Sequence, residues 1–218
     1  MRESAQRLLQ LPALPKANKD GEYASFKRYF QDLLAQGITS IGDAGISPER
    51  LEIYQQLVAE GFPMRFNLMI SESALPQLLD GRIARSNTDW LRVSAVKVFH
   101  GNSLSGNTCW LYDPYEKINP ATGKQDYYGI PPTRSQAALD SLFRKIHDAG
   151  LQICVHSNGN REIDMVLTAI EAAQRANPRP NARHRIEHCS ITNPTQLARI
   201  KQDSVTFFDG QTVYEATK

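Results

Sequence analysis

Residues 151–173, LQICVHSNGNREIDMVLTAIEAA, change character halfway along their length. A mostly apolar run leads to His156, a short polar turn follows, and residues with helical spacing come next. This pattern is typical of a buried strand that ends on an imidazole just before a helix. One such histidine is more often a hydrogen-bonded core residue than a ligand, so its meaning depends on how the other strands end.

The same alternation of short apolar runs and helical stretches continues along the chain. The expected strands are residues 37–45, 62–70, 91–99, 151–156, 183–188 and 204–210. The expected helices include residues 25–36, 48–61, 135–150, 162–176 and 193–203. Gly37, Gly61 and Gly150 follow three of these helices, as helix-terminating glycines do. The alternation predicts an α/β fold with a parallel sheet, and the lack of a GxGxxG after the first strand favours a TIM-type barrel.

Composition narrows the class of protein. The chain has 218 residues, 41% of them hydrophobic, and a formal net charge of +2. This is enough to bury a substantial core, and no linker or repeat marks a boundary, so residues 1–218 are predicted to form a single domain. No basic stripe indicates nucleic acid, and no apolar run has membrane length. Three cysteines without zinc-like spacing indicate a reduced, cytoplasmic protein.

Reactive groups in a barrel of this type gather at the carboxyl ends of the strands. The predicted strand ends carry Asp43, Lys97, His156, His188 and Asp209. Taken singly, each has a structural explanation, because Asp beside Gly is typical of a turn and a Lys stem can carry its ammonium to solvent. Two further histidines are expected to be structural, His100 in a loop and His147 on a helix surface.

Three successive strands that end in Lys, His and His point to shared chemistry. A buried Lys tends to lose its proton, because low dielectric disfavours the ammonium. The neutral amine can take up carbon dioxide to form a carbamate, an oxygen ligand able to bridge two cations. Two imidazoles on neighbouring strands suit Zn²⁺, and such a centre activates water and polarises a carbonyl. The pattern therefore indicates a metal-dependent hydrolase.

These residues resemble the amidohydrolase superfamily, and specifically its family 3 of YtcJ-like metal-dependent hydrolases. Residues 37–45 look like the family's second strand, and residues 95–103 look like its lysine strand. Residues 155–164 are similar to the fifth-strand pattern His-x-x-Gly-Asp-x-x-Ile-Asp, and residues 183–189 match the sixth-strand Arg-Ile-Glu-His motif. The resemblance implies an incomplete TIM-type (β/α)8 barrel, about the second to the seventh βα units, without the flanking β-sandwich.

The resemblance also implies roles for individual residues. Lys97 would be the carbamylated bridging ligand, and His156 and His188 would hold one divalent metal ion, expected to be Zn²⁺. Arg185 and Glu187 are interpreted as a structural ion pair behind the site.

The chain departs from the family pattern at several points. His100 stands where the family usually has Asp, and Asn160 replaces the Asp of Gly-Asp, so hydrogen bonding around the ligands is expected to differ. No His-x-His of the family's first strand occurs, and the eighth-strand Asp that acts as general acid/base is expected beyond the C-terminus. The chain is therefore interpreted as an internal fragment with half of the metal site and no assigned catalytic residue.

Residues 100–134 form a long insertion after the lysine strand. Loops of this length in compact domains are often lids, and Trp110, Tyr112 and Tyr115 are candidates for contact with an aromatic or apolar substrate. An aromatic mini-core that anchors the loop is the alternative.

The predicted function is hydrolysis of carbon–nitrogen bonds other than peptide bonds, in a small amide, formamide or cyclic amide. Two alternatives stay open: an inactive barrel remnant or binding module, and an ester or phosphoester hydrolase that uses the same metal site. The expected partner is a small-molecule substrate. A homo-oligomer is also an option, because the open edges of an incomplete barrel, on its second and seventh strands, can pair with another chain.

Overall fold

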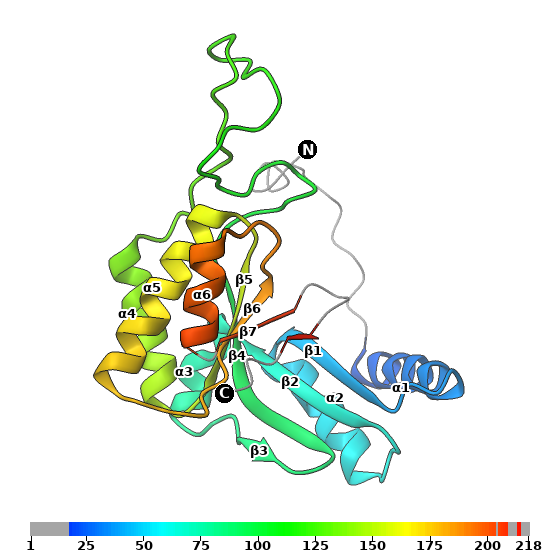
Figure 1. Cartoon of the computed structure of the whole chain (residues 1–218). Coiled ribbons are helices and arrows are strands. Elements are labelled where there is room, and N and C mark those ends of the chain that lie inside the picture. The colour runs from blue at the N-terminus through cyan, green and yellow to red at the C-terminus, as the bar shows by residue number, and fades with distance from the viewer. Residues whose placement is uncertain (1–17, 204, 209–212, 215–218) are drawn as a thin grey trace. The chain divides into compact units, whose positions relative to one another are not determined.

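The computed structural model describes residues 18–203, 205–208 and 213–214 (Figure 1). The chain divides into two compact units, Met1–Ala95 and Val96–Lys218. Strand β4 (Leu91–Phe99) begins in the first unit and ends in the second. Within the described residues, no helix combines the length and the apolar character needed to cross a lipid bilayer.

The first unit alternates helices and strands. Its elements are α1 (Lys19–Ala35), β1 (Ser40–Ile46), α2 (Pro48–Ala59), β2 (Arg65–Ser71), the 3-10 turn η2 (Glu72–Ala74), α3 (Leu75–Leu79) and β3 (Ser86–Asn87). Strands β1 and β2 are parallel, and β3 pairs antiparallel with the start of β4. Helix α1 begins before the predicted residue 25, because the Asn18 side chain caps it by accepting a hydrogen bond from the Gly21 amide.

Asp43 has a structural role in this unit. The prediction placed it at a strand end, but β1 continues to Ile46. Its carboxylate accepts a hydrogen bond of 2.5 Å from the hydroxyl of Tyr54, which is buried on α2. Asp43 therefore ties a helix to its neighbouring strand. Asp209, the other predicted strand-end Asp, lies outside the described residues.

The second unit repeats a strand–helix pattern. Its elements after β4 are α4 (Gln136–Asp148), β5 (Gln152–Ser157), α5 (Asn160–Ala176), β6 (Arg185–His188), α6 (Pro194–Gln202), β7 (Thr206–Phe208) and β8 (Val213–Tyr214). Strands β5, β6 and β7 are parallel neighbours, and α4, α5 and α6 lie side by side on one side of them (Figure 1). This is the arrangement of a partial (β/α) barrel, as the sequence predicts. The sequence also predicted that the β7 edge of the sheet would be unpaired. This prediction is wrong, because β8 pairs antiparallel with β7.

Helical periodicity accounts for the core of the second unit. Residues three and four apart on α4 and α5 are buried: Leu139, Phe143, Ile146, Ile163, Val166, Leu167 and Ile170. Full burial of one such side chain is worth about 1.5–3 kcal/mol, so this interface supplies much of the unit's stability. The glycines that follow α1, α2 and α4 have φ of 83°, 74° and 79°, as helix-terminating glycines should. His147, expected on a helix surface, is instead fully buried in α4.

Candidate metal centre

The second unit brings two of the predicted ligands together. His156 lies in β5 and His188 ends β6, in strands whose parallel register aligns Ser157 with His188. Their imidazole rings meet edge to face, with centroids 4.7 Å apart and planes inclined by 75°. Residues that are 32 positions apart in the chain thus share one end of the sheet.

Lys97 is buried in the second unit, near the carboxyl end of β4, and only 5% of it is exposed. Burial lowers the pKa of its ammonium, and the nearby Glu187 carboxylate only partly opposes this shift. The amine lies 4.9 Å from the centre of the Phe99 ring, whose centroid is 5.6 Å from that of His156. Burial lowers the pKa of His188, and the positive charge of Lys97 lowers it further, so these two predicted ligands interact electrostatically.

His188 has a strained backbone. Its φ is 72° and that of Cys189 is 50°, in the left-handed region that side chains other than glycine rarely adopt. The Cys189 amide donates hydrogen bonds to the carbonyls of Ser157 (3.1 Å) and Glu187 (3.0 Å), which hold this turn in place. Strain of this kind often accompanies a functional constraint, since it persists only where the surroundings impose it.

A backbone carbonyl from the insertion orients His156. Nε2 of His156 donates to the carbonyl of Asn102 at 2.9 Å, and Nδ2 of Asn158 donates to the same carbonyl at 2.8 Å. Binding of a metal ion through Nε2 would replace this hydrogen bond. The insertion therefore contributes directly to the surroundings of a predicted ligand.

Glu162, which the sequence did not single out, anchors the insertion. Its fully buried carboxylate accepts hydrogen bonds from the amides of Trp110 (2.7 Å), Gly159 (3.0 Å), Asn102 (3.2 Å) and Asn158 (3.2 Å). Burial raises the pKa of this carboxyl, and the four amides oppose the shift. A Cβ at Gly159 would lie 2.2 Å from the Trp110 carbonyl oxygen, so only glycine permits this contact. The sequence did contain a signal for this role, because a glutamate three residues after the N-cap of a helix often accepts hydrogen bonds from backbone amides at the helix start.

Three further side chains were singled out in the sequence, the ion-pairing Arg185 and Glu187 and the histidine His100. Arg185 and Glu187 form the predicted ion pair, with two hydrogen bonds of 2.9 Å. His100 follows β4 directly, as its loop assignment requires, but only 2% of it is exposed. Neither of its ring nitrogens has a hydrogen-bond partner among the described residues, and burial lowers its pKa to about 4.

The donor set fits one ion of a metal pair. Among residues 18–203, 205–208 and 213–214, no three His, Cys, Asp or Glu side chains converge where a metal ion could bind. The predicted set contains only two of these side chains, and its third member is a lysine that gains an anionic oxygen only as a carbamate. The chemistry of His156, His188 and Lys97 is therefore compatible with half of a binuclear centre.

The aromatic residues of the insertion separate into two groups. Trp110 and Tyr112 line a cavity against α5, whereas Tyr115 packs on Tyr127 with ring centroids 5.6 Å apart. The Tyr115 hydroxyl donates to the carbonyl of Cys109 at 2.9 Å. Tyr115 thus makes contacts within the loop, and substrate contact by Trp110, Tyr112 and Tyr115 stays a prediction.

Comparison with known proteins identifies the class. The sequence profile of the amidohydrolase family matches residues 1–205, so the chain belongs to this family. A metal-dependent hydrolase of uncharacterized activity from Pyrococcus furiosus superposes with a TM-score of 0.73 at 25% identity, over 94% of this chain and 42% of that one. A second such hydrolase, from Pyrococcus horikoshii OT3, also has a TM-score of 0.73, at 23% identity over 88% and 37% of the two chains. The predicted family and partial barrel are both confirmed.

Two curated relatives refine the resemblance. YtcJ of Bacillus subtilis (strain 168) is 24% identical over 207 residues, which are 90% of this chain and 36% of that protein. The N-substituted formamide deformylase of Arthrobacter pascens is 25% identical over 179 residues, 78% of this chain and 31% of the relative. The chain thus spans about a third of the length of these relatives.

Proposed function

We propose that the chain supplies part of the active site of a metal-dependent hydrolase that cleaves carbon–nitrogen bonds other than peptide bonds. The observation that carries this proposal is the burial of Lys97 in the same region as His156 and His188. Membership of the amidohydrolase family supports the reaction class. The named activity of the Arthrobacter pascens relative favours small formamides among the amides that we expect as substrates.

Each of the three residues has a defined chemical role in this proposal. Because burial favours the neutral amine of Lys97, its nitrogen can add to carbon dioxide. A nitrogen–carbon bond forms, one N–H proton leaves to solvent, and a carbamate anion results. Burial and the charge of Lys97 lower the pKa of His188, which favours the neutral imidazole whose nitrogen lone pair can act as a ligand. A divalent ion held by these groups, for which we propose Zn²⁺, would supply Lewis-acid activation of water and of the carbonyl.

The neighbouring residues position these groups. The carbonyl of Asn102 orients the His156 ring, and Glu187 places a negative charge near Lys97 that Arg185 partly balances. The resemblance assigns the second pair of histidines and the proton-transferring Asp to other strands of the family barrel. We therefore expect the isolated 218 residues to bind at most one ion weakly and to show almost no amide hydrolysis.

Metal binding tests the site without relying on turnover. The chain, Lys97→Ala and His188→Ala are each studied by equilibrium dialysis against Zn²⁺ in the presence of bicarbonate, so that even weakly held zinc is measured at a known free concentration. We expect saturable zinc binding by the unaltered chain and its loss in both variants, with Lys145→Ala on the surface of α4 as the matched lysine control. ¹³C NMR after incubation with ¹³C-bicarbonate should show a carbamate signal that Lys97→Ala lacks. Equal zinc binding by all four proteins would refute the ligand assignment.

Activity is tested in a longer chain that also carries a first-strand His-x-His and a last-strand Asp. An N-alkylformamide, an anilide, a cyclic imide, an ester and a phosphodiester are compared as substrates. We expect amide or formamide cleavage, loss of activity in Lys97→Ala, and partial rescue of that variant by added short carboxylates. Preferential cleavage of the ester or phosphodiester would favour the alternative hydrolase, and no turnover of any substrate would favour an inactive remnant.

A further inference from the structure

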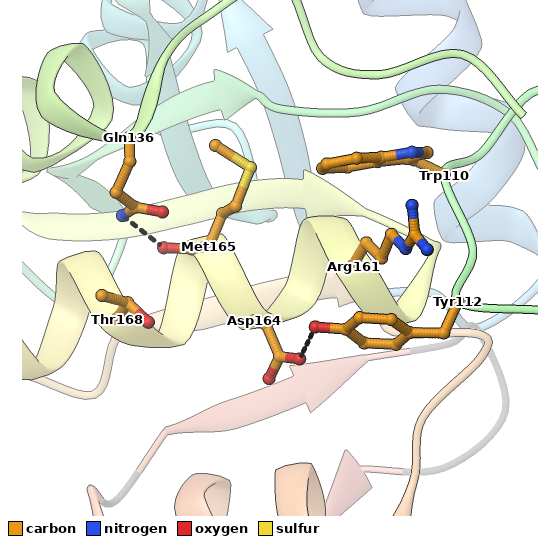
Figure 2. A pocket seen from close by; sticks show the side chains of 7 residues that line it. All are labelled: Trp110, Tyr112, Gln136, Arg161, Asp164, Met165 and Thr168. Carbon is orange, nitrogen blue, oxygen red and sulfur yellow. Dashed lines mark hydrogen bonds between the residues drawn. The ribbon is translucent and has the colours of Figure 1, made fainter. Parts of the chain in front are cut away.

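A cavity of about 500 Å³ lies between the insertion and α5, apart from the predicted metal ligands (Figure 2). Trp110 and Tyr112 line it from the insertion, and Arg161, Asp164, Met165 and Thr168 line it from α5. Asp164, Met165 and Thr168 lie three, four and seven positions after Arg161, so the four residues occupy one face of the helix. Glu162, the buried anchor of the insertion, is not among the lining residues.

Arg161 presents its guanidinium to this cavity between aromatic rings. Its guanidinium carbon lies 5.1 Å from the ring centres of Trp110 and Tyr112 and 5.3 Å from that of Tyr128. Among the described residues, its buried Nε has no hydrogen-bond partner and no carboxylate forms an ion pair with the guanidinium. Aromatic faces attract the group by cation–π contact, but they do not accept a hydrogen bond from this Nε–H.

The carboxylate that lines the same cavity has other partners. Asp164 accepts a hydrogen bond of 2.6 Å from the Tyr112 hydroxyl and pairs at 2.9 Å with Arg199, which also pairs with Glu171 (Figure 2 shows the first contact). Asp164 therefore directs its contacts to Tyr112 and Arg199 and not to Arg161. The cavity combines a guanidinium that has no carboxylate partner among the described residues with the apolar surfaces of Trp110 and Met165.

We propose that this cavity binds a small organic carboxylate with a flat, apolar body. The carboxylate would accept hydrogen bonds from Arg161, whose planar fork matches two carboxylate oxygens. The body of the ligand would lie against Trp110 and Met165. Cavities of about 300–1,000 Å³ are typical of small-molecule sites, and this one falls in that range. The apolar lining distinguishes the site from one for an inorganic anion.

Phenylacetate and its uncharged isostere phenylacetamide are suitable probes. The protein contains two tryptophans, so Trp90→Phe, at an exposed position, leaves Trp110 as the only indole reporter. Titration in the presence of a chelator excludes the metal centre, so the result does not depend on the proposed hydrolase activity. We expect saturable quenching by phenylacetate, and binding of phenylacetamide and inorganic phosphate about 10- to 100-fold weaker, the effect of losing a charge-assisted pair or the apolar contact.

Substitution of the cation is the second arm of the test. Arg161→Gln should weaken phenylacetate binding about 10- to 100-fold, while Arg175→Gln, an exposed arginine on the same helix, should leave it unchanged. Circular dichroism checks the folding of both variants, and the wild-type comparison of the two probes decides the question if Arg161→Gln does not fold. Absence of saturable quenching by phenylacetate, equal affinity for phenylacetamide or phosphate, or unchanged binding by a folded Arg161→Gln would overturn the proposal.

Discussion

His147 and His184 hydrogen-bond to each other in the core of the second unit, whereas His156 and His188 face each other edge-on at the strand ends. In the first pair Nδ1 of His147 lies 2.8 Å from Nε2 of His184. In the second pair no hydrogen bond joins the rings, whose centroids are 4.7 Å apart. Both pairs couple residues from distant parts of the chain, but their remaining ring nitrogens have different surroundings.

The core pair is fully satisfied by protein atoms. Nε2 of His147 donates to the carbonyl of Asn177 at 2.7 Å, so its Nδ1 accepts from His184. Nδ1 of His184 in turn accepts from the amide of Ile153 at 3.0 Å. Every ring nitrogen has one partner when both rings are neutral, which is the arrangement expected of a structural pair.

The His188 ring of the strand-end pair has different surroundings. Nε2 of His156 donates to a carbonyl of the insertion, but His188 is exposed, and its ring forms no hydrogen bond with the described residues. An exposed imidazole without a hydrogen-bond partner in this part of the chain, on a strained backbone, is available to an external ligand. The difference between the pairs shows that partner saturation, and not the presence of histidine alone, separates structural from candidate functional residues.

Removal of a core histidine should give the largest effect on stability. His184→Ala leaves Nδ1 of His147 and the Ile153 amide buried without partners and opens a cavity, so we expect a loss of about 3–4 kcal/mol. His188→Ala removes an exposed ring and should change stability by less than about 0.5 kcal/mol. Urea denaturation measures both values at about pH 7.5, one unit above the ordinary pKa of His, where an unperturbed imidazole is mostly neutral. Losses of similar size would contradict the contrast between the pairs.

Acid should weaken the core pair through His184. Burial lowers its pKa from the ordinary 6.5 to about 3, so the folded protein keeps this ring neutral while the unfolded chain protonates it. The stabilising contribution is complete above about pH 6.5 and declines as the pH falls towards about 3, by about 1.4 kcal/mol per pH unit. At about pH 5 the expected loss from this residue is about 2 kcal/mol. Urea denaturation at about pH 7.5 and at about pH 5 measures this loss of stability, and His184→Gln should lack the part that comes from protonation of His184.

The sequence predicted the parts of this comparison that depend on local pattern. The bounds of β4 agree with the predicted 91–99, because a short, mostly apolar run between polar segments is typical of a buried strand. The strand ends that carry Lys97, His156 and His188 were predictable, since parallel strands place their carboxyl ends at one edge. The position of Asp43 was not, because the extent of β1 depends on its pairing with β2.

The sequence did not predict which polar side chains are buried, because their hydrogen-bond partners lie far away in the chain. His147 lies in the last turn of a helix, where a histidine is usually exposed. It is buried because His184 and Asn177, 37 and 30 positions later, complete its hydrogen bonds. Glu162 was missed for the same reason, as two of its four amide donors come from the insertion, 52 and 60 positions earlier.

Zinc should stabilise the protein through the strand-end pair alone. A ligand at ten times its Kd stabilises the folded state by about 1.4 kcal/mol, which is measurable as a rise in Tm. We expect this rise in the unaltered chain and in Lys145→Ala, and not in His188→Ala or Lys97→Ala. A rise that persists in His188→Ala would show that zinc binds elsewhere and would remove the functional side of the comparison.

The smallest expected effect concerns the backbone of His188, whose φ is 72°. A left-handed conformation costs a residue with a Cβ about 1–2 kcal/mol, and glycine avoids this cost but loses more entropy on folding. His188→Gly should therefore stabilise the protein by about 0.5–1 kcal/mol relative to His188→Ala, while it abolishes the zinc-dependent rise in Tm. His184 is not among the residues with positive φ, so His184→Gly should be at least as destabilising as His184→Ala. Urea denaturation of the four variants gives the comparison directly. Greater stability of His188→Gly than of His188→Ala, together with the loss of zinc binding, would mean that the strain is maintained for the ligand and not for the fold, whereas lower stability of His188→Gly than of His188→Ala would show that the left-handed backbone costs this turn nothing.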